Sequence, residues 1–310
     1  MLLKQVLDVY DQLDRADIDG EKVSNYFISL GAKNIETKRV KGDKGSTDFV
    51  KICVAGKNGK INGGDAPTLG VLGRLGGLGA RPEMIGFVSD GDGALAALSV
   101  AAKLLDMQAK GDCLDGDVII CTHVCPDAPT QPHDPVPFMG SPIDMETAND
   151  YEVCEEMEAI LSIDTTKGNR VINHLGFAIS PTVKSGYILR VSEDLLSIKQ
   201  DVTGCLPHVF PLTMQDITPY GNGLYHLNSI LQPATATDAP VVGVAITTQT
   251  AVPGCATGAS HFTHIEAASR FAVEVCKNFG KKKCDFFSDD EFRLITAKYG
   301  SMKILQTSGK

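Results

Sequence analysis

A short apolar segment, an acidic glycine turn and a helix of small residues follow one another at 84–105. The segment 84–88 predicts a buried strand, and the alanines and leucines of 94–105 fall at helical spacing. Asp90 and Asp92 stand in the turn between them. In an open α/β sheet, ligands bind beyond the carboxyl ends of the strands. The sequence therefore places two carboxylates where a metal ion or a polar substrate would be held.

The rest of the chain alternates in the same way. Short apolar runs predict strands, and longer stretches with apolar residues at helical spacing predict helices. The expected strands cover 34–40, 48–55, 84–88, 117–122, 160–163, 186–191 and 241–246, and the expected helices cover 6–13, 19–30, 94–109, 194–202 and 265–279. This order predicts a three-layer α/β fold with a mixed, mostly parallel sheet flanked by helices. We expect residues 1–280 to form one domain and 281–310 an appendage.

Composition excludes several classes of function. The net charge is −9, and the one basic cluster, 281–283, is typical of a solvated helix end, so nucleic-acid binding is disfavoured. No apolar run reaches the length of a membrane span, and the first eight residues become charged too soon for a signal peptide. Nine cysteines without an export signal indicate reduced thiols. We therefore expect a cytoplasmic protein that binds neither nucleic acid nor membranes.

A glycine-rich segment, 67–78, favours a glycine-interrupted helix. Its glycines do not match the dinucleotide fingerprint, and no Lys-Ser/Thr pair follows them, so it is not a P-loop. Close packing against the sheet explains the glycines better than a phosphate site. A proline-rich loop at 126–144 is long enough for us to expect a functional role for it.

Polar side chains collect just after several of the predicted strands. Carboxylate, imidazole and thiolate groups are the usual zinc ligands. The residues concerned are Asp90, Asp92, His123, Cys125, Asp127, Asp164, His261 and His264. This pattern predicts a metal or active site at one edge of the sheet. The alternative for Asp90 or Asp92 is a helix cap, since aspartate is a favoured N-cap residue.

Cys121, His123 and Cys125 resemble a metal clip. Residues two apart share a face of a strand, so all three could bind one ion only if the strand stays extended. Cys121 suits the core better. Cys121 or Cys125 with His123 could also form a cysteine nucleophile and its base, which requires a lowered thiol pKa. His174, His208 and His226 are interpreted as structural histidines.

The order of these elements resembles that of the co-catalytic zinc exopeptidases, the aminopeptidase and carboxypeptidase group with a phosphorylase/hydrolase-like fold. The segment 90–98 is similar to that group's acidic turn and helix, which implies that Asp90 is the metal-bridging carboxylate. Asp164 is similar to the later carboxylate ligand, and His264 is similar to the last histidine ligand. Segments 73–82 and 121–129 are also similar to a prokaryotic family known as a domain of unknown function.

Two motifs of the exopeptidases are missing. Where a His-x-Asp should stand, 55–59 reads Ala-Gly-Lys-Asn-Gly, and where a Glu-Glu should stand the chain reads His123-Val124. The carboxylate that takes the proton from the bridging water is therefore absent from its usual place.

The leading hypothesis is a metal-dependent hydrolase of amide bonds in a small substrate, such as a short peptide or an amino-acid derivative. Asp90, Asp164 and His264 would bind a divalent metal, zinc first and manganese or cobalt as alternatives, with His123 as a further ligand. The metal would lower the pKa of bound water toward about 7.

A general base must lie within hydrogen-bond reach of that water, and Asp92, His123 and Asp127 are the candidates. The alternative hypothesis is a non-catalytic ligand-binding or assembly relative, which the missing motifs favour. The resemblance also implies a homo-oligomer.

Overall fold

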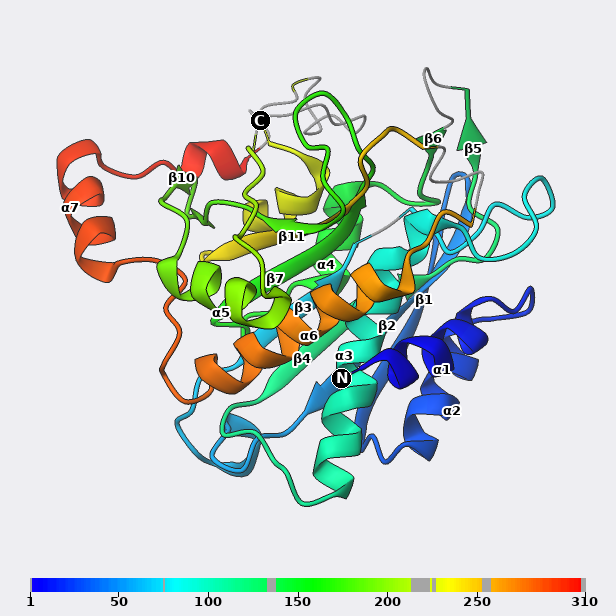
Figure 1. Cartoon of the computed structure of the whole chain (residues 1–310), viewed down its shortest axis with the longest axis horizontal. Coiled ribbons are helices and arrows are strands. Elements are labelled where there is room, and N and C mark those ends of the chain that lie inside the picture. The colour runs from blue at the N-terminus through cyan, green and yellow to red at the C-terminus, as the bar shows by residue number, and fades with distance from the viewer. Residues whose placement is uncertain are drawn as a thin grey trace.

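A mixed sheet with helices on both faces forms the centre of the molecule (Figure 1). The structure is a computed structural model, and it describes residues 2–74, 76–132, 138–212, 224, 227–252 and 258–307. In these residues, nine strands join the main sheet and two more form a separate hairpin.

Four parallel strands occupy the middle of the sheet. In spatial order they are β4 (Val118–Val124), β3 (Leu69–Gly73), β7 (Ala159–Thr166) and β11 (Val241–Thr247). Antiparallel strands extend both sides: β2 (Gly45–Val54) and β1 (Asn34–Gly42) beyond β4, and β8 (Gly176–Ile179), β9 (Val183–Lys184) and β10 (Tyr187–Ile188) beyond β11. The hairpin is β5 (Thr130–Gln131) with β6 (Phe138–Met139).

Helices cover both faces of the sheet. One face carries α1 (Leu3–Leu13), α2 (Gly20–Ser29), α3 (Asp92–Ala109), α5 (Glu193–Thr203) and α6 (Phe262–Phe279), and the other carries α4 (Met145–Glu152) and the 3₁₀ helix η3 (Ser229–Thr235). The predicted three-layer α/β fold with a mixed sheet is confirmed. None of the helices in the described residues is both long and apolar enough to cross a lipid bilayer.

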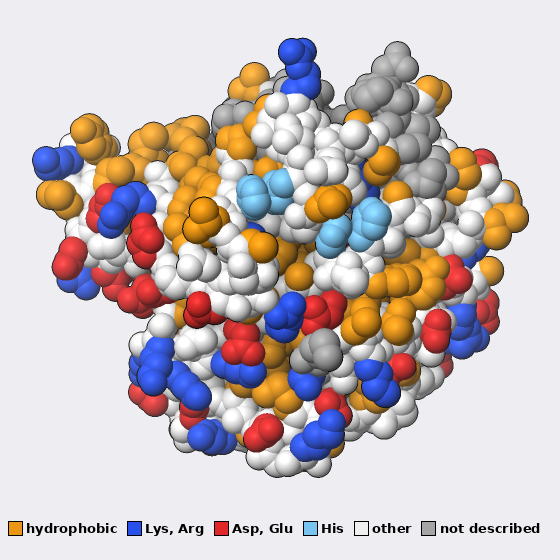
Figure 2. Space-filling model, in the orientation of Figure 1, with side chains coloured by type: hydrophobic (Ala, Val, Ile, Leu, Met, Phe, Trp, Pro, Cys, Tyr) orange, Lys and Arg blue, Asp and Glu red, His pale blue; other side chains and the backbone are white. Residues whose placement is uncertain are grey.

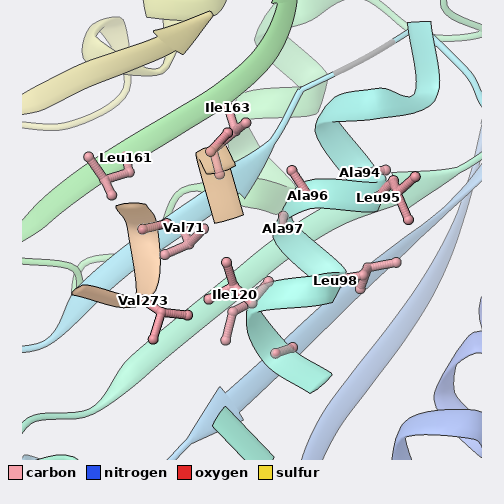
Figure 3. Close-up of a cluster of buried hydrophobic side chains, with 14 of the residues drawn as sticks. Val71, Ala94, Leu95, Ala96, Ala97, Leu98, Ile120, Leu161, Ile163 and Val273 are labelled. Atoms are coloured by element: carbon pink, nitrogen blue, oxygen red, sulfur yellow. The ribbon is translucent and has the colours of Figure 1, made fainter. Parts of the chain in front are cut away.

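The largest core lies between the sheet and α3. Small side chains along α3 let it lie close to the strands, and Val71, Ile120, Leu161 and Ile163 pack beneath it (Figure 3). Full burial of one such side chain stabilises the fold by about 1.5–3 kcal/mol. Because α4 and η3 cover the opposite face, the central strands are apolar on both sides, which explains their uninterrupted hydrophobic runs.

The prediction of a helix over 67–78 is wrong, because residues 69–73 form β3 in the middle of the sheet. Glycines are required in β3 because atoms of neighbouring segments lie close to its backbone. A Cβ at Gly70 would lie 2.5 Å from the sulfur of Met157, and one at Gly73 would lie 2.6 Å from the carbonyl oxygen of Gly93. A pattern typical of a broken helix is therefore a strand packed tightly on both faces.

The predicted strand at 84–88 is also wrong. Ile85 is 93% exposed, and Gly86 has a φ of +95°, in the left-handed region that favours glycine. Phe87 and Val88 are buried, but within a loop that continues into the 3₁₀ helix η2 (Ser89–Gly91). The segment predicted as a strand at 186–191 contributes only the short β10.

The C-terminal segment is joined to the core at its start. Cys284 and Phe286 are buried in the main core, and the hydroxyl of Thr182 donates to the carbonyl oxygen of Phe286 at 2.6 Å. Beyond them, α7 (Asp289–Tyr299) buries no residue and lies at one end of the molecule, followed by the 3₁₀ helix η4 (Lys303–Gln306) (Figure 1). A further 3₁₀ helix, η1 (Lys60–Asn62), precedes β3.

Gly93, in the first turn of α3, allows that helix to touch the ends of β3 and β7. A Cβ there would lie 2.5 Å from the carbonyl oxygen of Arg74 and 2.7 Å from that of Ile163. Gly93→Ala is expected to push α3 off the sheet edge and lower the free energy of unfolding by about 3 kcal/mol, measured by urea denaturation. Gly140→Ala is the control, since its nearest neighbour would lie 3.5 Å away. Equal effects of the two substitutions would contradict this packing argument.

Candidate functional site

The candidate site lies at the carboxyl edge of the parallel strands, where α3 begins. The amide of Arg74 donates to the carbonyl oxygen of Ile163 at 2.8 Å, which joins the ends of β3 and β7. The hydroxyl of Thr165 donates to the carbonyl oxygen of Ser89 at 2.9 Å and fixes η2 on the same edge. The predicted location of Asp90 and Asp92 is therefore correct, although β3 and not 84–88 supplies the strand end.

Asp92 is fully buried and makes two polar contacts. One carboxylate oxygen accepts a hydrogen bond from the hydroxyl of Ser260 at 2.5 Å, and the other lies 3.5 Å from the ammonium group of Lys167. Lys167 follows directly after β7, and its side chain is only 10% exposed. The ammonium group also donates to the carbonyl oxygen of Ala259 at 3.5 Å.

The helix-cap alternative for these aspartates does not hold. The N-cap residue of α3 is Gly91, with no side-chain capping bond, and Asp92 is the first residue of the helix. A carboxylate in the first turn still interacts favourably with the helix dipole.

Burial dominates the electrostatics of the carboxylate pair. Burial raises the pKa of Asp90 and of Asp92 to about 6 each, and Lys167 partly offsets both shifts. The neighbouring Asp92 raises the pKa of Asp90 further, and the Ser260 hydrogen bond lowers that of Asp92. Asp90 keeps part of its side chain exposed, whereas Asp92 does not. Carboxylates perturbed in this way are typical of functional sites.

His264 lies in the first turn of α6, the helix that follows the loop of Ala259 and Ser260. Burial lowers the pKa of its imidazole, and the positive charges of His261 and Lys167 lower it further. Its ring lies 5.0 Å from that of His261, and its Nδ1 atom is buried without a hydrogen-bond partner. Lys167 therefore acts on three groups that the sequence analysis selected. We call Asp90, Asp92, Lys167, Ser260 and His264 the carboxylate–lysine site.

Asp164 points away from this site. Side chains alternate along a strand, and Leu161 and Ile163 of β7 belong to the core under α3. Asp164 therefore faces the layer of η3, and one of its oxygens accepts from the amide of Thr165 at 2.7 Å. Asp92 and His264 lie at the ends of helices on the opposite face.

His123 and Asp127 have different surroundings. The Nδ1 atom of His123 lies 2.7 Å from the hydroxyl of Thr47, and its ring stacks on Phe49 at 5.3 Å. Asp127 is exposed and lies 3.7 Å from the sulfur of Cys125. The contacts described for these two residues are therefore with β2 and with the loop after β4.

The donor groups do not fit the predicted divalent metal. Within the parts of the chain that the structure describes, no three His, Cys, Asp or Glu side chains come together as a metal site. The predicted ligands Asp90, His123, Asp164 and His264 are not assembled into such a set: strand alternation turns Asp164 to the other face, and the ring of His123 contacts Thr47 and Phe49. The cation beside the carboxylates is the ammonium group of Lys167.

A cysteine nucleophile is not supported either. Burial raises the pKa of Cys125 to about 12 and raises that of Cys121 well above its usual value, so neither thiol is prepared as a thiolate.

Two further histidines pair with one another, and burial lowers the pKa of His174, with the charge of His264 among the further causes. His174 stacks on His208 at 3.7 Å and contacts the carbonyl oxygen of Phe177, in keeping with a structural role. The face of the molecule in Figure 2 shows histidine side chains in two groups. His226 and residues 133–137 of the proline-rich loop lie outside the described residues.

Two cationic side chains of low exposure at this edge of the sheet were not predicted from the sequence. Lys167 and Arg74 each follow a central strand, where a charged residue usually marks the return to solvent. Arg74 is 2% exposed, and its guanidinium group is paired with the carboxylate of Glu152 on α4. Their positions at strand ends could have identified them from the sequence, because ligands bind at this edge of the sheet in α/β folds.

Comparisons with known proteins agree with the family prediction. Residues 38–309 match the model of a family described as "Protein of unknown function (DUF1177)". A crystal structure of the LapA aminopeptidase of Legionella pneumophila is similar, at 13% identity and a TM-score of 0.49, over 93% of this chain and 71% of that one. A second LapA structure from that organism has 13% identity and a TM-score of 0.48, over 91% and 72%. No match was found among the curated proteins.

Proposed function

Since the chain belongs to the DUF1177 family of proteins of unknown function, we propose its activity from the carboxylate–lysine site: hydrolysis of an amide bond in a small substrate, such as a short peptide or an amino-acid derivative. The observation that carries the proposal is the buried contact between Asp92 and the ammonium group of Lys167, with the partly exposed Asp90 two residues away; burial raises the pKa of each carboxylate to about 6. Acid, base and cation are thus available at one edge of the sheet.

Asp90 is the general base. Part of its side chain is exposed, and a pKa near 6 leaves it ionised at neutral pH yet able to hold a proton. It takes a proton from the water that attacks the amide carbonyl carbon. It then returns that proton to the nitrogen as the C–N bond breaks, which releases an amine and a carboxylic acid.

Lys167 stabilises the negative charge that develops on the carbonyl oxygen. An ammonium group in a site of low exposure interacts with such a charge more strongly than it would in water. Asp92 is the positioning residue, since it is buried beside Lys167 and accepts a hydrogen bond from Ser260.

The resemblance to zinc exopeptidases implies a divalent metal, and the chain's own residues weigh against it. Lys167 already supplies a positive charge beside Asp92, and Asp164 faces away. No step above involves a metal ion. Zinc, manganese or cobalt added to the protein is expected to leave turnover unchanged, as is chelation.

A second candidate function is the non-catalytic binding of the same class of ligand. It is favoured by the contact between Lys167 and Asp92. This contact already pairs the buried carboxylate when no substrate is bound, so the charges of the site have a stable arrangement without catalysis. Such a protein would bind short peptides or amino-acid derivatives without cleaving them.

Asp90→Asn separates these functions. The substitution is expected to lower kcat on a panel of dipeptides, N-acyl amino acids and primary amides by about 100-fold or more, followed through the released amine. Because ionised Asp90 is disfavoured by burial, the same variant is expected to be more stable than wild type near neutral pH, by about 1–2 kcal/mol. A structural carboxylate would show the opposite change in stability.

The pH profile and a matched variant complete the test. Wild-type kcat/KM is expected to rise with pH through about 6, because Asp90 must lose its proton to act as a base. Asp65→Asn is the control, since the side chain of Asp65 is 92% exposed and pairs with Lys282, which is not part of the carboxylate–lysine site. Full activity of Asp90→Asn would overturn the catalytic role, and ligand binding without turnover by the wild-type protein would establish the second function instead.

A further inference from the structure

The outer surface of α7 is exposed and has a symmetric order of charges. No residue of α7 is buried, and Leu294, an apolar residue in the middle of the helix, is 56% exposed. Asp290 lies one helical turn before Leu294 and Lys298 one turn after it, so the three residues share one stripe of the helix. Phe292 and Ile295, on the other side, are partly buried.

The partly buried side of α7 is anchored to the domain, which leaves the outer stripe for another molecule. The ring of Phe292 meets those of Tyr187 and Phe287 edge-on, and the ammonium group of Lys184 lies 5.1 Å from its centroid. The hydroxyl of Tyr187 donates to the carbonyl oxygen of Gly300 at 2.5 Å. The helix is therefore held in place and does not require an outer partner to form.

Further apolar side chains extend the exposed surface beyond the stripe. They are Ile188 at 57% exposure, Tyr299 at 73%, Ile304 at 66% and Leu305 at 43%. Hydrophobic side chains gather at this end of the molecule in Figure 2, beside the position of α7 in Figure 1. Exposed apolar side chains gathered in one region are typical of an interaction site.

We propose that α7 pairs antiparallel with α7 of a second copy of this chain, about a two-fold axis at Leu294. In that arrangement Leu294 meets its own copy, and Asp290 of each chain lies opposite Lys298 of the other. Asp290 and Lys298 lie equally far from Leu294, so the two-fold axis forms both ion pairs at once. This self-complementarity is what a two-fold interface requires, and it commits the surface to a second copy over an unrelated partner.

The dimer is expected to be dissociable. A single helix pair with its flanking apolar residues covers less than the roughly 1,200–2,000 Å² of a stable interface, so micromolar association is expected. The resemblance described above implies an oligomer but no surface, and this proposal is independent of the activity at the carboxylate–lysine site.

Sedimentation equilibrium of the full chain over a concentration series tests the proposal, with reductant present because Cys113 and Cys205 are exposed. Wild type is expected to approach twice 33.0 kDa at high concentration. Leu294→Glu is expected to remain at 33.0 kDa, whereas Leu206→Glu, at a 77% exposed position elsewhere, should dimerise like wild type.

Charge reversal provides the decisive comparison. Asp290→Lys and Lys298→Glu should each raise the dissociation constant by roughly tenfold or more, since each places like charges opposite one another. The double variant restores opposite charges and should return to within about threefold of wild type. A wild-type mass of 33.0 kDa at every concentration, a dimer that Leu294→Glu leaves intact, or a double variant no better than the single ones would each overturn the proposal.

Discussion

Lys167→Met is expected to lower the free energy of unfolding by about 3–5 kcal/mol near pH 7.5, because it leaves the buried carboxylate of Asp92 without its ion-pair partner and removes the positive charge that acts on Asp90. Near pH 5 the loss should be much smaller. The folded-state pKa of Asp90 and of Asp92 is raised to about 6 even with Lys167 present, so both are largely protonated there. The destabilisation should therefore increase as the pH rises through about 6 and beyond.

Urea denaturation at both pH values measures this effect, and hydrolysis assays on the same samples should show loss of turnover. Lys110→Met is the matched control. Lys110 pairs with Asp106 on α3, but its side chain is 68% exposed, so no comparable loss or pH dependence is expected. Equal unfolding midpoints for Lys167→Met and wild type at pH 7.5 would show that Lys167 does not neutralise the pair.

Removal of Arg74, a second cation of low exposure at the same sheet edge, should be as damaging. The Arg74 and Glu152 side chains are 3% and 1% exposed, and Arg74 also lies 3.6 Å from the sulfur of Met145. Arg74→Met leaves Glu152 as an unpaired buried charge and is expected to lower the free energy of unfolding by about 3–5 kcal/mol. Glu152→Leu should cost a similar amount, for the reciprocal reason.

The double variant Arg74→Met/Glu152→Leu distinguishes a charge effect from a packing effect. A buried ion pair replaced by apolar residues of similar volume is often neutral in stability, so most of the loss should be recovered. The measurement is a double-mutant cycle from urea denaturation. Additive losses would mean that the side chains matter through their shape and not through their charge.

Much of the framework was predictable from the sequence because its signals are local. The strands β4, β7 and β11 are rich in apolar residues, and α6 carries apolar residues at helical spacing. The strand β3 was not predictable in the same way. Its glycines exist because Met157 and the first turn of α3 approach its backbone, and these contacts come from distant parts of the chain.

The candidate site was likewise predictable only in part. Asp90, Asp92 and His264 were found because polar residues beside predicted element ends converge in α/β folds. The direction in which Asp164 points depends on strand register, which a single sequence does not contain. Lys167 was missed because a lysine after a strand is ordinarily solvated, whereas here its ammonium group contacts Asp92 and the distant carbonyl oxygen of Ala259.

The central position of β3 has a consequence for synthesis. Its two neighbours, β4 and β7, both lie later in the chain, so a nascent polypeptide cannot flank β3 on both sides until Thr166 has left the ribosome. Non-local strand pairing of this kind slows folding and prolongs the exposure of apolar surface. The first half of the chain therefore keeps one edge of its central strand unpaired until the strand β7 has been synthesised.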